Sequence, residues 1–124
     1  MKANELRIGN YLFNENSEAK QVVKIGFTRV WIGKINDYWD AVDYGDTSSI
    51  PLTEEWLLKF GFEEEGESFN LNDFSIELIG DDGRWCTYFF DTYHSVECSL
   101  SLIKYVHQLQ NLYFALTGEE LILN

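Results

Sequence analysis

The hydrophobic pattern changes its period once near the C-terminus, and this change constrains the fold more than any other feature of the chain. Residues 96–102 (VECSLSL) alternate between apolar and small or polar residues, which predicts a half-buried strand. Its inward-facing residues would be Val96, Cys98, Leu100 and Leu102. From residue 104 to 117 the apolar residues recur at helical spacing instead, and Gly118 supplies a stop. A strand that leads directly into a helix indicates a mixed α and β fold.

A second helix is predicted by its end signals. In residues 51–61 (PLTEEWLLKFG), Thr53 is placed to cap the free amides of the first turn. Leu52 and Leu57 have the spacing of a hydrophobic staple, and Gly61 can take the left-handed conformation that ends a helix. The residues expected to face the core are Trp56, Leu57 and Phe60.

The remaining segments favour strands and turns. Strand patterns bounded by turn residues occupy 6–13, 21–25, 29–32, 74–79 and 85–90. The last two flank Asp81-Asp82-Gly83, a hairpin signature, and residues 63–67 read as an acidic turn. Aspartates recur every third residue from Asp37 to Asp46, without the ligand order of an EF-hand. We expect a solvated loop there, with a short strand around 38–42.

These elements predict an α+β domain that spans residues 1–124. Residues 1–50 would form an SH3-like antiparallel β meander. Residues 51–124 would add the short helix, a second antiparallel sheet and a C-terminal helix packed on that sheet. A chain of 124 residues with 45% hydrophobic residues and one Pro has the size and composition of a single domain.

The charge is unevenly distributed along the chain. The net charge is −12, but residues 1–34 have a balance of +3 and residues 35–124 a balance of −15. An acidic protein of this kind is unsuited to binding nucleic acid or anionic membranes over its whole surface. One basic patch remains, formed by Lys20, Lys24, Arg29 and Lys34 beside aromatic residues.

The sequence also bears on where the protein is located. The N-terminus has no apolar core of a secretory signal, and no stretch is long and apolar enough to span a membrane. The only cysteines, Cys86 and Cys98, suit a reducing compartment as buried thiols. We therefore expect a cytoplasmic protein, with a Cys86–Cys98 disulfide as the less favoured alternative.

No pattern of residues predicts catalysis, a metal or a cofactor. Cys86, His94, Cys98 and His107 lack the paired short spacings of a zinc site. Cys98, His94 and Asp91 could be assembled into a nucleophile triad, but no motif places an oxyanion donor beside the thiol. Glycine-rich phosphate loops are also absent from the sequence. We expect a protein that is not an enzyme.

The polar side of the C-terminal helix is the most specific candidate for a binding surface. It consists of Lys104, His107, Gln108 and Asn111, with Gln110 at its margin. Amides form neutral, directional hydrogen bonds, which suits contact with a protein partner. A merely solvated helix face is the alternative.

Three blocks of sequence resemble a known family. The blocks LRIGNYLF, IPLTEEWLLKFGF and IKYVHQLQNLYFALTGEEL are similar, in this order, to a family of small uncharacterised proteins from anaerobic gut bacteria. Genes of that family often lie in prophage-like or other mobile-element regions. The resemblance implies a bacterial, cytoplasmic protein and assigns no activity, cofactor or site residue.

Three hypotheses of function follow. The first is a non-enzymatic accessory or interaction module of a mobile element, acting through a protein partner. The second is an acidic mimic that occupies the nucleic-acid site of another protein, suggested by the −15 balance beyond residue 34. The third is weak nucleic-acid binding through the basic N-terminal patch.

Overall fold

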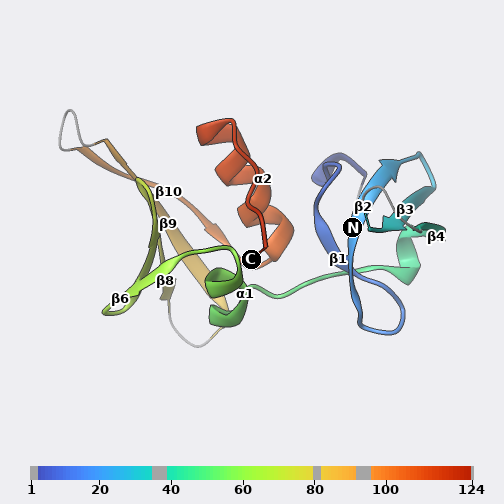
Figure 1. The fold of residues 1–124 in the computed structure, drawn as a ribbon, viewed down its shortest axis with the longest axis horizontal. Coiled ribbons are helices and arrows are strands. Elements are labelled where there is room, and N and C mark those ends of the chain that lie inside the picture. The colour runs from blue at the N-terminus through green and yellow to red at the C-terminus, as the bar shows by residue number, and fades with distance from the viewer. Residues whose placement is uncertain (1–2, 35–38, 80–81, 92–95, 124) are drawn as a thin grey trace.

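The computed structural model of the chain describes residues 3–34, 39–79, 82–91 and 96–123. Within these residues the fold is α+β, with two antiparallel sheets of five strands each, two α-helices and two 3-10 turns. The sheets lie at opposite ends of an elongated molecule, and helix α2 (Val106–Thr117) lies between them (Figure 1). The predicted fold class is confirmed.

The first sheet is a meander whose last strand returns beside its first. Its strands are β1 (Tyr11–Phe13), β2 (Ala19–Ile25), β3 (Arg29–Gly33), β4 (Trp39–Asp43) and β5 (Ser48–Ser49). They are ordered β4-β3-β2-β1-β5, because β5 crosses back to pair with β1. The 3-10 turns η1 (Ala3–Glu5) and η2 (Tyr44–Asp46) precede β1 and β5. The strands predicted within β2, β3 and β4 are therefore confirmed.

The strand predicted over residues 6–13 is wrong in its first half. Gly9 has a φ of 98°, which is the left-handed region that glycine tolerates. The Asn10 side chain accepts a hydrogen bond from the Arg7 amide at 2.7 Å and so closes a local turn. Asn10 also donates its backbone amide to the Arg7 carbonyl, so the turn takes up both backbone groups of Arg7. The strand is confined to residues 11–13, although Gly9 and Asn10 still form backbone hydrogen bonds with Val22 of β2.

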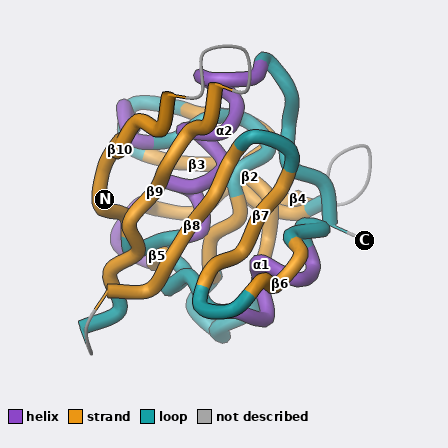
Figure 2. Tube along the Cα trace, turned by 90° about the vertical axis from the view of Figure 1, so that its left-hand side faces the viewer, coloured by secondary structure: helices purple, strands orange, loops and turns teal. Residues whose placement is uncertain are grey.

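The second sheet is a simple meander in chain order. Its strands are β6 (Glu63–Glu65), β7 (Ser68–Leu71), β8 (Phe74–Ile79), β9 (Arg84–Asp91) and β10 (Val96–Ile103). The helices lie behind one face of this sheet, and its other face is turned toward the viewer in Figure 2. The predicted β8–β9 hairpin is confirmed, with Gly83 at a φ of 77°.

Two expectations for this sheet are wrong. The acidic segment 63–67 is not only a turn, because Glu63–Glu65 form the edge strand β6 and the chain turns at Gly66. Charged side chains on an edge strand discourage pairing with another molecule. In β10 the alternation fails at its end: Leu102 is exposed and Ile103 is buried. A register shift between Ser99 and Leu102 exchanges the two faces there. The side chains of Val96, Cys98 and Leu100 lie outside the described residues.

The helices begin and end where the sequence signals predict. Helix α1 (Glu54–Lys59) has Thr53 as its N-cap, which accepts a hydrogen bond from the Trp56 amide. Helix α2 ends at Gly118, which has a φ of 74° and donates its amide to the Phe114 carbonyl. Tyr113 of α2 contacts Phe74 of β8 edge to face, so the C-terminal helix packs on the second sheet as expected.

Two hydrophobic cores meet at strand β1. The first core lies inside the N-terminal sheet and consists of Leu6, Leu12, Val22, Val30 and Ile32. The larger core lies between the second sheet and the helices and includes Leu57, Phe74, Ile76, Trp85 and Leu109. Leu12 faces the first core, whereas its neighbours Tyr11 and Phe13 pack against the second. Strand β1 therefore contributes one face to each core.

The segment between the two sheets is held by hydrogen bonds rather than being a free linker. The Leu52 amide donates to the Lys104 carbonyl at 2.8 Å, and the Val106 amide donates to the Ile50 carbonyl at 2.9 Å. The buried Trp85 indole donates to the Leu52 carbonyl at 3.1 Å. Residues 50–52 are thus fixed against the start of α2 and the second sheet.

Candidate functional site

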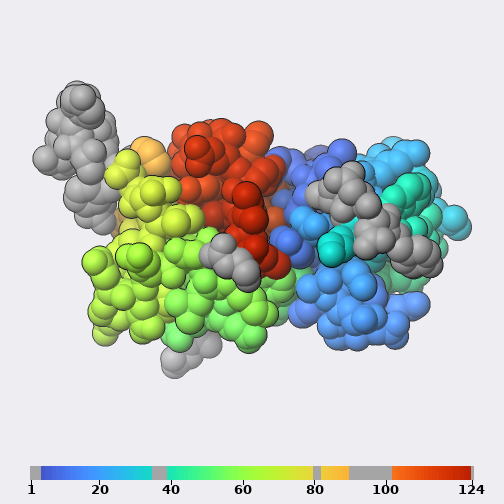
Figure 3. All heavy atoms as spheres, in the orientation of Figure 1, coloured from blue at the N-terminus to red at the C-terminus, as the bar shows by residue number. Residues whose placement is uncertain are grey.

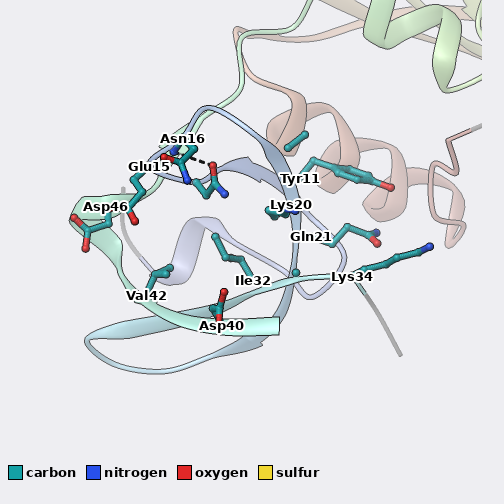
Figure 4. Close-up of a pocket in the computed structure, with 13 residues that line it drawn as sticks. Tyr11, Glu15, Asn16, Lys20, Gln21, Ile32, Lys34, Asp40, Val42 and Asp46 are labelled. Atoms are coloured by element: carbon teal, nitrogen blue, oxygen red, sulfur yellow. Dashed lines mark hydrogen bonds between the residues drawn. The ribbon is translucent and has the colours of Figure 1, made fainter. Parts of the chain in front are cut away.

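The first sheet borders a hollow of about 600 Å³ (Figure 4). Strands β1 to β4, the β1–β2 turn and η2 all contribute to its wall. Hollows of this size accommodate small molecules or short stretches of polypeptide. This hollow is the candidate binding site.

The floor of the hollow is aliphatic and its rim is polar. Ile32 and Val42 supply the floor. Both are also part of the first core or packed against it, so the strand geometry that builds that core also shapes the hollow. Amide side chains line part of the rim, namely Asn14, Asn16 and Gln21. Tyr11 lines it too, and burial raises the pKa of its hydroxyl, so the hydroxyl stays protonated at neutral pH.

Charges of both signs surround this floor. Lys20 and Lys34 line the hollow together with three carboxylates, Glu15, Asp40 and Asp46. Figure 4 shows Glu15 and Asp46 on one side of the hollow and Lys34 on the other, with Ile32 between them. Glu15 and Asp46 therefore lie on the side away from Lys34, whereas the third carboxylate, Asp40, lies beside its cross-strand partner Ile32.

The predicted basic patch is divided between two faces of the sheet. A bulge in β2 pairs Val22 with Ile32 but Lys24 with Trp31, so Lys24 lies on the face opposite to Val22. There its ammonium group lies 4.6 Å from the centre of the Trp31 ring. Arg29 forms an ion pair of 3.1 Å with Asp43. Only Lys20 and Lys34 of the predicted patch lie at the hollow.

The polar side of α2 faces the N-terminal segment of the same chain. His107 is buried, and Asn111 donates its side-chain amide to the Glu5 carbonyl at 3.0 Å. The expectation that this side of the helix faces solvent is wrong for these two residues. Lys104 and Gln108 are exposed. The side-chain oxygen of Gln108 accepts hydrogen bonds from the backbone amides of Lys104 and Tyr105 and so caps the start of the helix.

An amide bridge, formed by Asn10, Gln110 and Asn111, joins α2 to the turn before β1. The buried Gln110 accepts from the Tyr11 amide at 2.9 Å and donates to the Gly9 carbonyl at 3.0 Å. The Asn10 side-chain amide donates to the side-chain oxygen (Oδ1) of Asn111 at 2.8 Å. Figure 3 shows the red α2 against the blue N-terminal segment at the middle of the molecule. The amides predicted to bind a partner are thus engaged within the chain.

Arg7 extends this bridge to the end of the chain. Its guanidinium donates to the side-chain oxygen (Oδ1) of Asn111 at 2.8 Å and forms an ion pair with the Glu120 carboxylate. It also lies 4.1 Å from the centre of the Phe114 ring. Sequence reasoning missed the role of Arg7, because no local pattern signals a contact across more than 100 residues.

His107 is a buried imidazole beside this bridge. Its ring stacks on Tyr105 with 5.9 Å between the centroids. Within the described parts of the chain, no hydrogen-bond partner reaches its Nδ1. Burial lowers the pKa of His107 from its ordinary value, and the charge of Glu5 opposes that shift. The imidazole is therefore held in its neutral form.

The two cysteines lie at different positions of the β9–β10 ladder. Cys86 is buried, and the β9–β10 register places it opposite Leu102, whereas Cys98 lies opposite Phe89. His94 lies outside the described residues. Over residues 3–34, 39–79, 82–91 and 96–123, no three His, Cys, Asp or Glu side chains are grouped to hold a metal ion. None of the described helices has the length and apolar character needed to cross a membrane.

The chain was compared with known protein families, curated proteins and solved structures. No protein-family model, curated protein or solved structure matches the chain.

Proposed function

We propose that this protein is a non-catalytic interaction module that binds a segment of a partner protein in the hollow of its first sheet. The observation that carries the proposal is the hollow itself, which has an aliphatic floor and charges of both signs in its wall. Apolar surface combined with a few fixed polar groups is typical of ligand sites in proteins. It also offers a partner both burial and directional contacts.

The alternative functions receive less support from the same residues. A nucleic-acid strand in the hollow would meet three carboxylates, Glu15, Asp40 and Asp46, which repel phosphates. An acidic mimic would use the exposed glutamates of β6. Their position on an edge strand already has a sufficient explanation, because charge there prevents sheet-to-sheet pairing.

Selection from a random peptide library displayed on phage tests the proposal. The variant Asp40→Trp places a large ring at the hollow, because Asp40 is exposed, lines the hollow and pairs with Ile32 of the first core. Ala41→Trp is the matched control, because Ala41 is the next residue of the same strand, is also exposed and pairs with Trp31 on the other face of the sheet. We expect peptides enriched on wild type and Ala41→Trp to be lost on Asp40→Trp. Absence of enrichment, or equal enrichment on all three proteins, would contradict the proposal.

A further inference from the structure

Two lysines that line the hollow belong to neighbouring chain segments. Gln21 pairs with Gly33 and Val22 with Ile32, so this antiparallel register, continued one position beyond the end of β3, sets the backbone of Lys20 opposite that of Lys34. Lys20 also pairs with Leu12, whose side chain is buried in the first core, so both lysines lie on the inner face of the sheet.

These two ammonium groups are not neutralised within the part of the chain that the structure describes, where neither forms an ion pair. Like charges directly opposite each other on a sheet are unfavourable. An anionic group bound between Lys20 and Lys34 would relieve this repulsion.

The opposite side of the hollow has the reverse charge. Glu15 lies in the β1–β2 turn and Asp46 in η2, and both carboxylates are exposed. Neither is neutralised by a cation among the described residues. Ile32 lies between this acidic side and Lys34 (Figure 4), with Asp40 across from it on β4, and Val42 completes the floor.

From this order of charges, and resting on the proposed function, we infer that the hollow binds an extended peptide segment carrying an acidic, an aliphatic and a basic residue at alternate positions. Alternate side chains of an extended chain point to the same side, so three such residues face the sheet together. The acidic residue lies between Lys20 and Lys34, the aliphatic residue on Ile32 and Val42, and the basic residue against Glu15 and Asp46. A ligand that carries charges of one sign only would be repelled by the like charges on one side of the hollow.

Three synthetic peptides of equal length test the inference: Gly-Asp-Ser-Val-Ser-Lys-Gly, its all-acidic relative with two Asp, and its all-basic relative with two Lys. Binding to the full chain is measured by calorimetry at low salt. We expect the mixed peptide to bind about tenfold more tightly than either relative, since complementary charge decides between similar ligands. The double variant Lys20→Glu/Lys34→Glu should transfer the preference to the all-basic peptide.

Each result separates the inference from the proposed function. Equal binding of the three peptides, or tightest binding of the all-acidic peptide, would overturn the charge order. If none binds while the phage library still yields peptides sensitive to Asp40→Trp, the inference fails and the interaction module stands. If the library also yields nothing, both fail.

Discussion

At the scale of single residues, His107 shows how a polar side chain can be recruited into a core. A helix face that carries Lys104, Gln108 and Asn111 is expected to be exposed to solvent, yet the His107 residue on that face is only 2% exposed. Among the residues that the structure describes, none forms a hydrogen bond to its buried Nδ1, and a buried nitrogen of this kind is a cost to the folded state. Protonation would add the larger cost of burying a charge.

This environment predicts a pH dependence of stability. The pKa of His107 is lowered in the folded chain, so below its ordinary value of 6.5 the unfolded chain binds a proton that the folded chain does not. The free energy of unfolding is therefore fully retained above pH 6.5 and falls as the pH drops from 6.5 toward the folded pKa. The slope is at most about 1.4 kcal/mol per pH unit for one proton. Urea unfolding at pH 7.5, 6.5 and 5.5 measures it.

The variant His107→Leu should flatten this dependence, because it removes the titrating group and the unpartnered nitrogen together. His94→Gln controls for the only other histidine of the chain. If wild type and His107→Leu lose stability in parallel between pH 7.5 and 5.5, His107 does not cause the loss.

At the scale of elements, the contact between α2 and β1 depends on the Gln110 side chain, which forms the hydrogen bonds that a neighbouring strand would form. Gln110 accepts from the Tyr11 amide and donates to the Gly9 carbonyl, as a neighbouring strand would. Helix α2 thereby satisfies backbone groups of the N-terminal sheet while its other side fills the second core. The helix is a structural joint between the sheets rather than a docking face.

Replacing Gln110 by Leu should therefore be strongly destabilising. The Tyr11 amide would lose its partner and the Gly9 carbonyl would keep only the longer bond from Gln21 at 3.4 Å. At about 1–3 kcal/mol for each lost bond, the cost is about 2–6 kcal/mol in all. Gln108→Leu is the matched control: Gln108 is exposed and serves only the helix start, so its loss costs about 1 kcal/mol. Denaturant unfolding compares the two variants. Equal losses would mean that the Gln110 bonds are not specially important.

At the scale of the whole molecule, the shared strand couples the two sheets. Leu12 faces the first core, and Tyr11 and Phe13 face the second, so β1 cannot leave one core without exposing the other. The amide bridge and the hydrogen-bonded segment 50–52 reinforce this coupling. Unfolding should therefore be cooperative across both sheets.

Amide hydrogen exchange tests the coupling. Val30→Ala, in the first core, should cost about 1–3 kcal/mol and lower the protection of β8 in the second sheet as much as that of β2. Ile76→Ala, in the second core, should reciprocally lower protection in β2. Unchanged protection of the remote sheet in both variants would show that the sheets unfold separately.

Features that depend on neighbouring residues along the chain could be predicted before the fold was known. The Thr53 cap, the Gly61 and Gly118 stops and the Asp-Gly turn at residue 83 were predictable, because capping groups and left-handed glycines act within one turn of backbone. The α+β class followed from the change of period after residue 102. Lys20 and Lys34 could be recognised as candidate site residues from the sequence. That they lie opposite each other on neighbouring chain segments could not be predicted from it.

Tertiary structure alone decided the features that depend on residues far apart in the sequence. The β1–β5 pairing, the bulge that moves Lys24 away from Lys20, and the exchange of Leu102 for Ile103 in the core are set by register between strands. The burial of His107 and Gln110 is set by the docking of α2 on the N-terminal turn. Hydrophobic periodicity specifies which side chains prefer burial, but the geometry of the surrounding strands and helices determines which of the remaining polar groups are enclosed with them.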